Sequence, residues 1–129
     1  MTGFKSFEDI ESWKIARRLA NEIFVISGHG NFAKDFVLRD QMRRASISAL
    51  SNIAEGFERD GNAEFVQFLS IAKGSVGEIR AQTYVALDFQ YIDQEQFEQL
   101  HAMATDLSRK LAALMTYLRS SGMKGTKYK

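Results

Sequence analysis

The stretch LHAMATDLSRKLAALMTYL, residues 100–118, decides the fold of this 129-residue chain. Its apolar residues are spaced alternately by four and three positions, which is typical of a helix that packs against other helices. These residues are Leu100, Ala104, Leu107, Leu111, Leu114 and Leu118. Asp93 and Gln96 have the spacing of a capping box, and Gly122 is a common residue after a helix end. We therefore predict a helix over 94–121.

Three more helices are predicted upstream of this one from the same kind of periodicity. Their ranges are about 7–27, 34–58 and 63–90. Ser6 and Asn62 are the expected N-caps of the first and third helices. The chain contains no proline and is rich in residues that favour helix. Because short connections make successive helices antiparallel neighbours, we predict an all-α, up-down four-helix bundle as one domain over 1–121. The basic tail at 122–129 is expected to be flexible.

The composition excludes several classes of protein. The apolar runs are far shorter than the roughly 20 residues that cross a bilayer, so we expect a cytoplasmic protein with no membrane partner. The absence of cysteine excludes disulfides, thiolate metal sites and a cysteine nucleophile. The net charge is +1 and the pI is about 8.0, below the value of about 9 that is common in dedicated nucleic-acid-binding domains. Nucleic-acid binding would therefore need a local basic patch, or its repetition in an oligomer.

Two of the predicted helices carry a second apolar stripe, which a single bundle core cannot bury. The stripe residues are Phe36, Ile47 and Leu50 in the second helix and Ile71, Val85 and Phe89 in the third. Two explanations are open. Either both helices lie centrally in the monomer and other parts of the chain cover their flanks, or the stripes form a subunit interface. Gly74 and Gly77 lie in the middle of the third helix, where glycine costs about 1 kcal/mol relative to alanine, so they need a packing or functional reason. Their GSVG spacing resembles the RNA-clamping loop of KH domains, but a helix does not provide that loop.

Four sequence motifs are more specific than the periodicity. They are FEDI at 7–10, QMRRA at 41–45, NIAEG at 52–56 and IAKGSVGE at 71–78. In series they closely resemble the bacterial four-helix bundle family, also called the S23 or 23S rRNA intervening-sequence protein family. The resemblance covers roughly residues 4–118. The sequence departs from the family pattern at 28–32, where the family leads us to expect a proline-containing turn. The resemblance implies a left-handed bundle that assembles as a homopentamer. It also implies a relationship to the nucleic-acid-binding accessory protein of diversity-generating retroelements, but no established activity.

No catalytic, metal or cofactor site is expected. A di-iron bundle needs Glu-x-x-His pairs on two helices, but only His101 has such a partner, Glu98, whereas His29 has none. Glu55 and Glu78 have no nucleophile or phosphate loop in the surrounding sequence. We expect each to accept hydrogen bonds from Asn52, Ser75 or an arginine where helices pack. The protein is therefore predicted not to be an enzyme.

The basic residues are the remaining candidates for a site. The candidates for phosphate contact are Lys14, Arg17 and Arg18, then Arg39, Arg43 and Arg44, and in the tail Lys124, Lys127 and Lys129. The alternative is that they form solvated faces with weak ion pairs. Arg39, Arg43 and Arg44 are the leading candidates, although loss of Arg43, beside the second stripe, is expected to affect assembly. Trp13 is expected to anchor the core, or else to offer an exposed stacking surface.

Two functional hypotheses follow from the sequence and the resemblance. The first is a non-catalytic homopentameric scaffold that binds structured RNA or other nucleic acid through phosphates, multiplied by its symmetry. The second is a protein-protein interaction scaffold with no nucleic-acid role.

Overall fold

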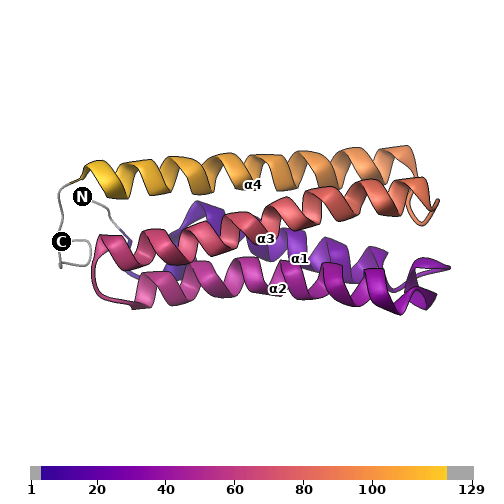
Figure 1. The fold of residues 1–129 in the computed structure, drawn as a ribbon, viewed down its shortest axis with the longest axis horizontal. Helices are drawn as coiled ribbons and strands as arrows, with labels where there is room; N and C mark the ends of the chain where they lie inside the picture. Colours follow the sequence, from indigo (N-terminus) through magenta and orange to yellow (C-terminus); the bar gives the residue numbers. More distant parts are fainter. Residues whose placement is uncertain (1–3, 122–129) are drawn as a thin grey trace.

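The computed structural model describes residues 4–121, and within this range it contains four long α-helices and no β-strand. The helices are α1 (Glu11–Ile26), α2 (Phe36–Glu58), α3 (Asn62–Asp88) and α4 (Gln94–Ser120), with 3-10 turns at Phe7–Asp9 and Phe32–Lys34. They lie side by side and are connected at alternating ends (Figure 1). Each helix packs against its neighbours in the order α1, α2, α3, α4 and back to α1. The all-α four-helix fold is confirmed, and the predicted tail at 122–129 lies outside the described residues.

The core follows the periodicity of the sequence. In α4 the seam residues Leu100, Ala104, Leu107 and Leu111 are each at most 1% exposed. Leu114 is only partly buried, and the next residue, Met115, is 7% exposed. This drift is expected because 3.6 residues per turn do not match a strict heptad. The helix begins as predicted, since the Asp93 carboxylate accepts a hydrogen bond from the backbone N–H of Gln96 at 2.8 Å.

The first helix begins later than expected. Ser6 precedes the 3-10 turn, and α1 begins only at Glu11. Between them, Ile10 has an extended backbone with ψ 124° and a side chain that is 1% exposed. Burial of the Ile10 side chain in the core therefore separates the 3-10 turn from the α-helix.

Asn62 is not the N-cap of the third helix. Gly61 occupies the N-cap position with a φ of +90°, a conformation that favours glycine. The Asn62 side-chain amide instead donates to the Leu118 carbonyl oxygen at 3.1 Å and to Ser121 Oγ at 2.8 Å. Asn62 therefore supplies a partner to the last turn of α4, whose carbonyls lack one within the helix.

Three glycines within helices differ in what surrounds them. A Cβ atom added at Gly56 would lie 2.7 Å from the Cβ of Phe68 and 2.8 Å from Cδ1 of Phe65. Gly56 therefore permits the close approach of α2 and α3. A Cβ at Gly74 or at Gly77 would meet no atom within 4 Å. These two glycines have no packing reason within the described chain.

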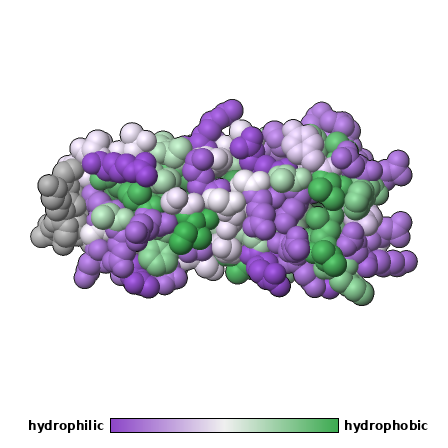
Figure 2. All heavy atoms as spheres, in the orientation of Figure 1, coloured by the Kyte–Doolittle hydropathy of each residue, from purple (hydrophilic) through white to green (hydrophobic). Residues whose placement is uncertain are grey.

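Four of the six residues of the second apolar stripes are exposed. Phe36 is 62%, Ile47 46%, Ile71 53% and Phe89 58% exposed. Leu50 and Val85 are partly buried against the core. On the face in Figure 2, hydrophobic residues form a band across the end that holds the α1–α2 and α3–α4 connections. The flanks of α2 and α3 are therefore not fully covered within the described chain. None of its helices is long and apolar enough to cross a membrane.

Candidate nucleic-acid interface

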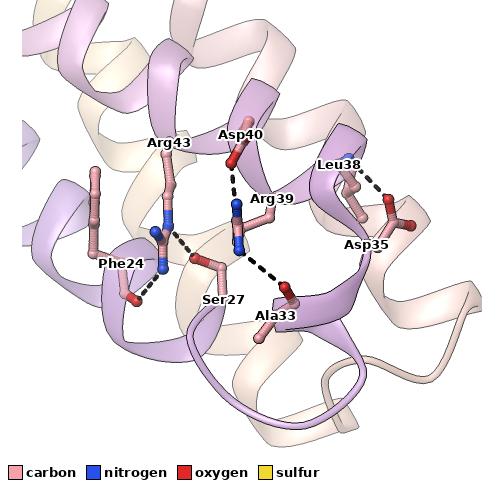
Figure 3. A network of polar contacts seen from close by, with 8 residues as sticks. All are labelled: Phe24, Ser27, Ala33, Asp35, Leu38, Arg39, Asp40 and Arg43. Carbon is pink, nitrogen blue, oxygen red and sulfur yellow. Dashed lines mark hydrogen bonds and ion pairs between the residues drawn. The ribbon is translucent and has the colours of Figure 1, made fainter.

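Arg43 on α2 is bound to the end of α1 (Figure 3). Its Nε donates to Ser27 Oγ at 2.8 Å, and its Nη2 donates to the Phe24 carbonyl oxygen at 3.1 Å. The guanidinium carbon also lies 4.6 Å from the centre of the Phe24 ring. A carbonyl in the last turn of a helix has no partner within that helix. Arg43 supplies one, so its hydrogen bonds serve the packing of α2 on α1.

Arg39, one turn earlier, is also engaged within the chain (Figure 3). Its Nη1 donates to the Ala33 carbonyl oxygen at 3.0 Å, and its Nε pairs with the Asp40 carboxylate at 2.8 Å. Its guanidinium lies 4.8 Å from the centre of the Phe36 ring. The hydrogen bond from Arg39 lowers the pKa of Asp40 below its ordinary value. Arg39 therefore holds the loop before α2.

Arg44 is the one arginine of this group that has no such bond to another described residue. It is exposed and lines a groove between α2 and α3 together with Ser48, Ser75 and Glu78. Ser75 Oγ donates to Ser48 Oγ at 3.0 Å within this groove. Of the three leading α2 candidates, only Arg44 is therefore available to a ligand without breaking an internal hydrogen bond.

The α1 basic patch, which we define as Lys14, Arg17 and Arg18, has a different environment. All three side chains are exposed, and none forms an ion pair with a residue in the range 4–121. With Trp13 and Asn21 they line a depression of about 340 Å³ on the outer surface of α1. The spacing of three and four residues places these side chains close together on one helical face. The fold therefore gathers three unpaired cations around one depression.

Trp13 connects this patch to the interior of the bundle. It is partly buried, and its ring meets the edge of Phe7 with ring centres 5.1 Å apart. The guanidinium of Arg17 lies 5.8 Å from the centre of the Trp13 ring. The indole Nε1 is buried and has no hydrogen-bond partner among the described residues. Trp13 thus combines the two expected roles, because it packs inward and also lines the depression.

The other candidate positions do not form a metal site. Within residues 4–121 no three His, Asp or Glu side chains are grouped so that they could hold a metal ion. His101 packs in a cluster with the rings of Tyr84 and Phe97, which also contact each other. Glu98 accepts a hydrogen bond from the Gln94 amide at 3.1 Å, and Glu55 pairs with Arg59 at 2.9 Å. Glu78 has no hydrogen bond to another described residue and lines the α2–α3 groove.

The sequence showed which basic residues are candidates, but not which of them form hydrogen bonds within the fold. Contacts of Arg43 join residues 16 and 19 positions apart, so no local pattern shows that this side chain is engaged. For the α1 basic patch a signal was present, because Trp13 lies four residues before Arg17 on the same helix.

Comparison with known proteins agrees with this architecture. The model of the family described as "23S rRNA-intervening sequence protein" matches residues 8–113. A solved structure of a protein with unknown function from the S23 ribosomal protein family, from Bacteroides thetaiotaomicron VPI-5482, has a similar fold. Its TM-score is 0.75 at 24% sequence identity, over 81% of this chain and 95% of that chain. At this identity the likeness shows the fold alone. No curated protein matches the sequence. Because the family match spans most of the chain, including α1 and α2, the protein belongs to the 23S rRNA-intervening sequence protein family.

Proposed function

We propose that the protein is a non-catalytic scaffold that binds structured RNA or other nucleic acid through the α1 basic patch. The observation that carries the proposal is the grouping of Lys14, Arg17 and Arg18 around one depression, without an ion pair to any residue in the described part of the chain. Cations that form no internal ion pair attract phosphates without first losing such a pair within the protein. The released counterions of the nucleic acid then favour binding.

Two further observations support this choice of surface. Trp13 presents part of its ring beside the cations, and aromatic rings next to basic residues are common where proteins bind single-stranded or looped nucleic acid. Arg39 and Arg43 donate hydrogen bonds to Ala33, Ser27 and Phe24. They are therefore weaker candidates for phosphate contact than the α1 basic patch and Arg44. The family name associates its members with 23S rRNA, which favours RNA over DNA as the first ligand to test.

Assembly is the second part of the proposal. Phe36, Ile47, Ile71 and Phe89 are large apolar side chains exposed on α2 and at α3, and exposed apolar side chains commonly mediate association where they gather. The open space above Gly74 and Gly77 allows a second helix to approach α3 closely. We propose that these surfaces join copies of the chain into the homopentamer that the family resemblance implies. A ring of five chains would repeat the α1 basic patch five times and raise its avidity for a polyanion.

A protein-interaction scaffold is the second candidate function, and one observation favours it. Phe36 and Val37 at the start of α2 are 62% and 70% exposed, at the same end of the bundle as Phe89. If copies of the chain leave these side chains uncovered, a different protein is their expected partner.

The test compares two variants with equal change in charge. Lys14→Ala/Arg17→Ala/Arg18→Ala removes the patch. Lys73→Ala/Arg109→Ala/Lys110→Ala removes three exposed cations from α3 and α4 that also form no ion pair within residues 4–121. Retention of a structured RNA on a filter is measured at about 50 mM salt, where screening is weak. We expect the first variant to lose most retention and the second to keep it. Equal losses would mean that only net charge matters, and no retention by the native protein would favour the protein-interaction scaffold. The mass from light scattering tests the pentamer.

A further inference from the structure

The turn between α3 and α4 holds a side chain where the backbone favours glycine. Gln90 has a φ of +63°, and it is the one non-glycine residue with positive φ among residues 4–121. The N–H of Gln90 donates to the Leu87 carbonyl at 2.9 Å, and the N–H of Tyr91 donates to the Ala86 carbonyl at 2.9 Å. This pair of bonds is the Schellman motif, in which glycine is the usual residue at the position of Gln90. A glutamine there destabilises the turn relative to glycine.

The Gln90 side chain lines a depression of about 330 Å³. The depression lies between the α1–α2 loop and the α3–α4 turn, and its polar lining consists of His29, Asn31, Gln90 and Gln96. The end of α1 and the ring of Tyr91 supply its apolar lining. Its volume is within the range of small-ligand sites in proteins.

These polar side chains have unused hydrogen-bonding capacity. Those of His29, Asn31 and Gln90 make no hydrogen bond to another described residue. The Oε1 of Gln96 accepts a hydrogen bond from the N–H of Asp93 at 2.9 Å, whereas its amide nitrogen bonds to no other described residue. None of the lining residues is an Asp, Glu, Lys or Arg. The depression therefore offers donors and acceptors from three carboxamides, without a lysine or arginine that would bind a phosphate.

The apolar wall of the depression is held in place. The Tyr91 hydroxyl donates to the Asp35 carboxylate at 2.8 Å, and its ring stacks on Phe32 with ring centres 5.3 Å apart at 25°. Phe32 is 1% exposed, so this stack is anchored in the core. Rigid support of this kind reduces the entropy lost when a ligand binds.

We propose that this depression binds a single unpaired nucleobase. Carboxamides pair with the edges of bases through two hydrogen bonds, and adenine N6 and N7 are the usual partners of Asn and Gln. A planar, uncharged ring matches a site with one aromatic wall, three carboxamides and no Asp, Glu, Lys or Arg in its lining. This inference rests on the proposed function and extends it, because the α1 basic patch contacts phosphates without reading a base. The strained Gln90 is then explained, since the position trades turn stability for a recognition group.

Free adenosine is the probe, because it carries the base without a phosphate. Titration of the native protein, followed by NMR, is expected to shift the side-chain amide resonances of Asn31, Gln90 and Gln96 to saturation. Gln90→Gly is expected to weaken adenosine binding at least tenfold and, at the same time, to raise the thermal midpoint. Gln67→Ala, which removes an exposed carboxamide from the outer face of α3, is expected to change neither.

The outcomes separate this proposal from the proposed function. If Gln90→Gly raises the thermal midpoint but leaves adenosine affinity unchanged, Gln90 belongs to the turn alone and the proposal is overturned. Absence of a saturable shift in the native protein overturns it as well, whatever RNA retention shows. Adenosine binding that persists in Lys14→Ala/Arg17→Ala/Arg18→Ala supports a base site independent of the phosphate contacts. Loss of adenosine binding in that variant, with the fold intact, contradicts the location of the site.

Discussion

Substitution of Gly56 by alanine is expected to destabilise the bundle, although alanine is the better helix former. The added Cβ would lie 2.7 Å from Phe68 Cβ and 2.8 Å from Phe65 Cδ1, both closer than carbon atoms approach without strain. Phe65 is 0% exposed, so its ring has no free space to enter. Overpacking of this kind costs about 3 kcal/mol, and the helix preference of alanine returns at most about 1 kcal/mol. The net loss in free energy of unfolding is about 2 kcal/mol.

Gly74 and Gly77 are matched controls for this substitution. They also lie within a long helix, but a Cβ there meets no atom of the described residues within 4 Å. Gly74→Ala and Gly77→Ala should therefore each raise the stability of the single chain by about 0.8–1 kcal/mol. If α3 packs against a second copy at these glycines, the same changes should weaken assembly. The sign of the effect on stability then depends on the protein concentration.

Urea unfolding and thermal unfolding, both at one fixed protein concentration, measure these differences in stability. For a chain of 129 residues, a loss of about 2 kcal/mol lowers the thermal midpoint by roughly 8 °C. A Gly56→Ala protein as stable as the native one would refute the claim that α2 and α3 meet closely at this residue. Destabilisation by Gly74→Ala in a monomeric sample would refute the open surface on α3.

Two other predictions concern the contacts around the α1–α2 loop. Arg43→Met removes the hydrogen bonds to the buried Ser27 hydroxyl and to the Phe24 carbonyl, and should lower the free energy of unfolding by about 1.5–3 kcal/mol. Arg43→Lys should recover only part of this, because lysine lacks the guanidinium fork; an unchanged urea midpoint in both variants would contradict the capping role. The pKa of the Asp35 carboxyl is lowered below its ordinary value of 3.8, mainly by the hydrogen bond from the Leu38 N–H and next by that from the Tyr91 hydroxyl. Its contribution to stability is therefore present above the ordinary pKa and is lost as the pH falls through the lower folded value. The thermal midpoint should fall more steeply with acid in the native protein than in Asp35→Ala, and parallel curves would show that these bonds do not contribute.

The fold could be predicted because its determinants are local. The spacing of Leu100, Leu107 and Leu111, with the capping box at Asp93, places α4 within one residue of its observed ends. Helix starts that depend on distant partners could not be predicted as well from the sequence. Asn62 has the sequence context of an N-cap, but its side chain bonds to Leu118, 56 residues away, and a local pattern contains no information about that contact.

The candidate site shows the same division between local and distant effects. The sequence named the basic residues as candidates, and those on α1 group together because they share one helical face. The division of the α2 arginines could not be predicted. Arg39 and Arg43 are held by backbone carbonyls of Ala33 and Phe24, which any residue type would provide. Only the folded chain shows that Arg44 differs from its two neighbours.

The most direct test of the account is the salt dependence of RNA binding. A plot of log Kobs against log salt concentration should have a steep negative slope for the native protein. Because each lost phosphate contact reduces the slope by about 0.7–0.9, Lys14→Ala/Arg17→Ala/Arg18→Ala should flatten it by about 2–3 for each chain in contact with RNA. Lys73→Ala/Arg109→Ala/Lys110→Ala should leave the slope close to the native value. Equal slopes for the native protein and the α1 variant would contradict the assignment of the phosphate contacts to this helix.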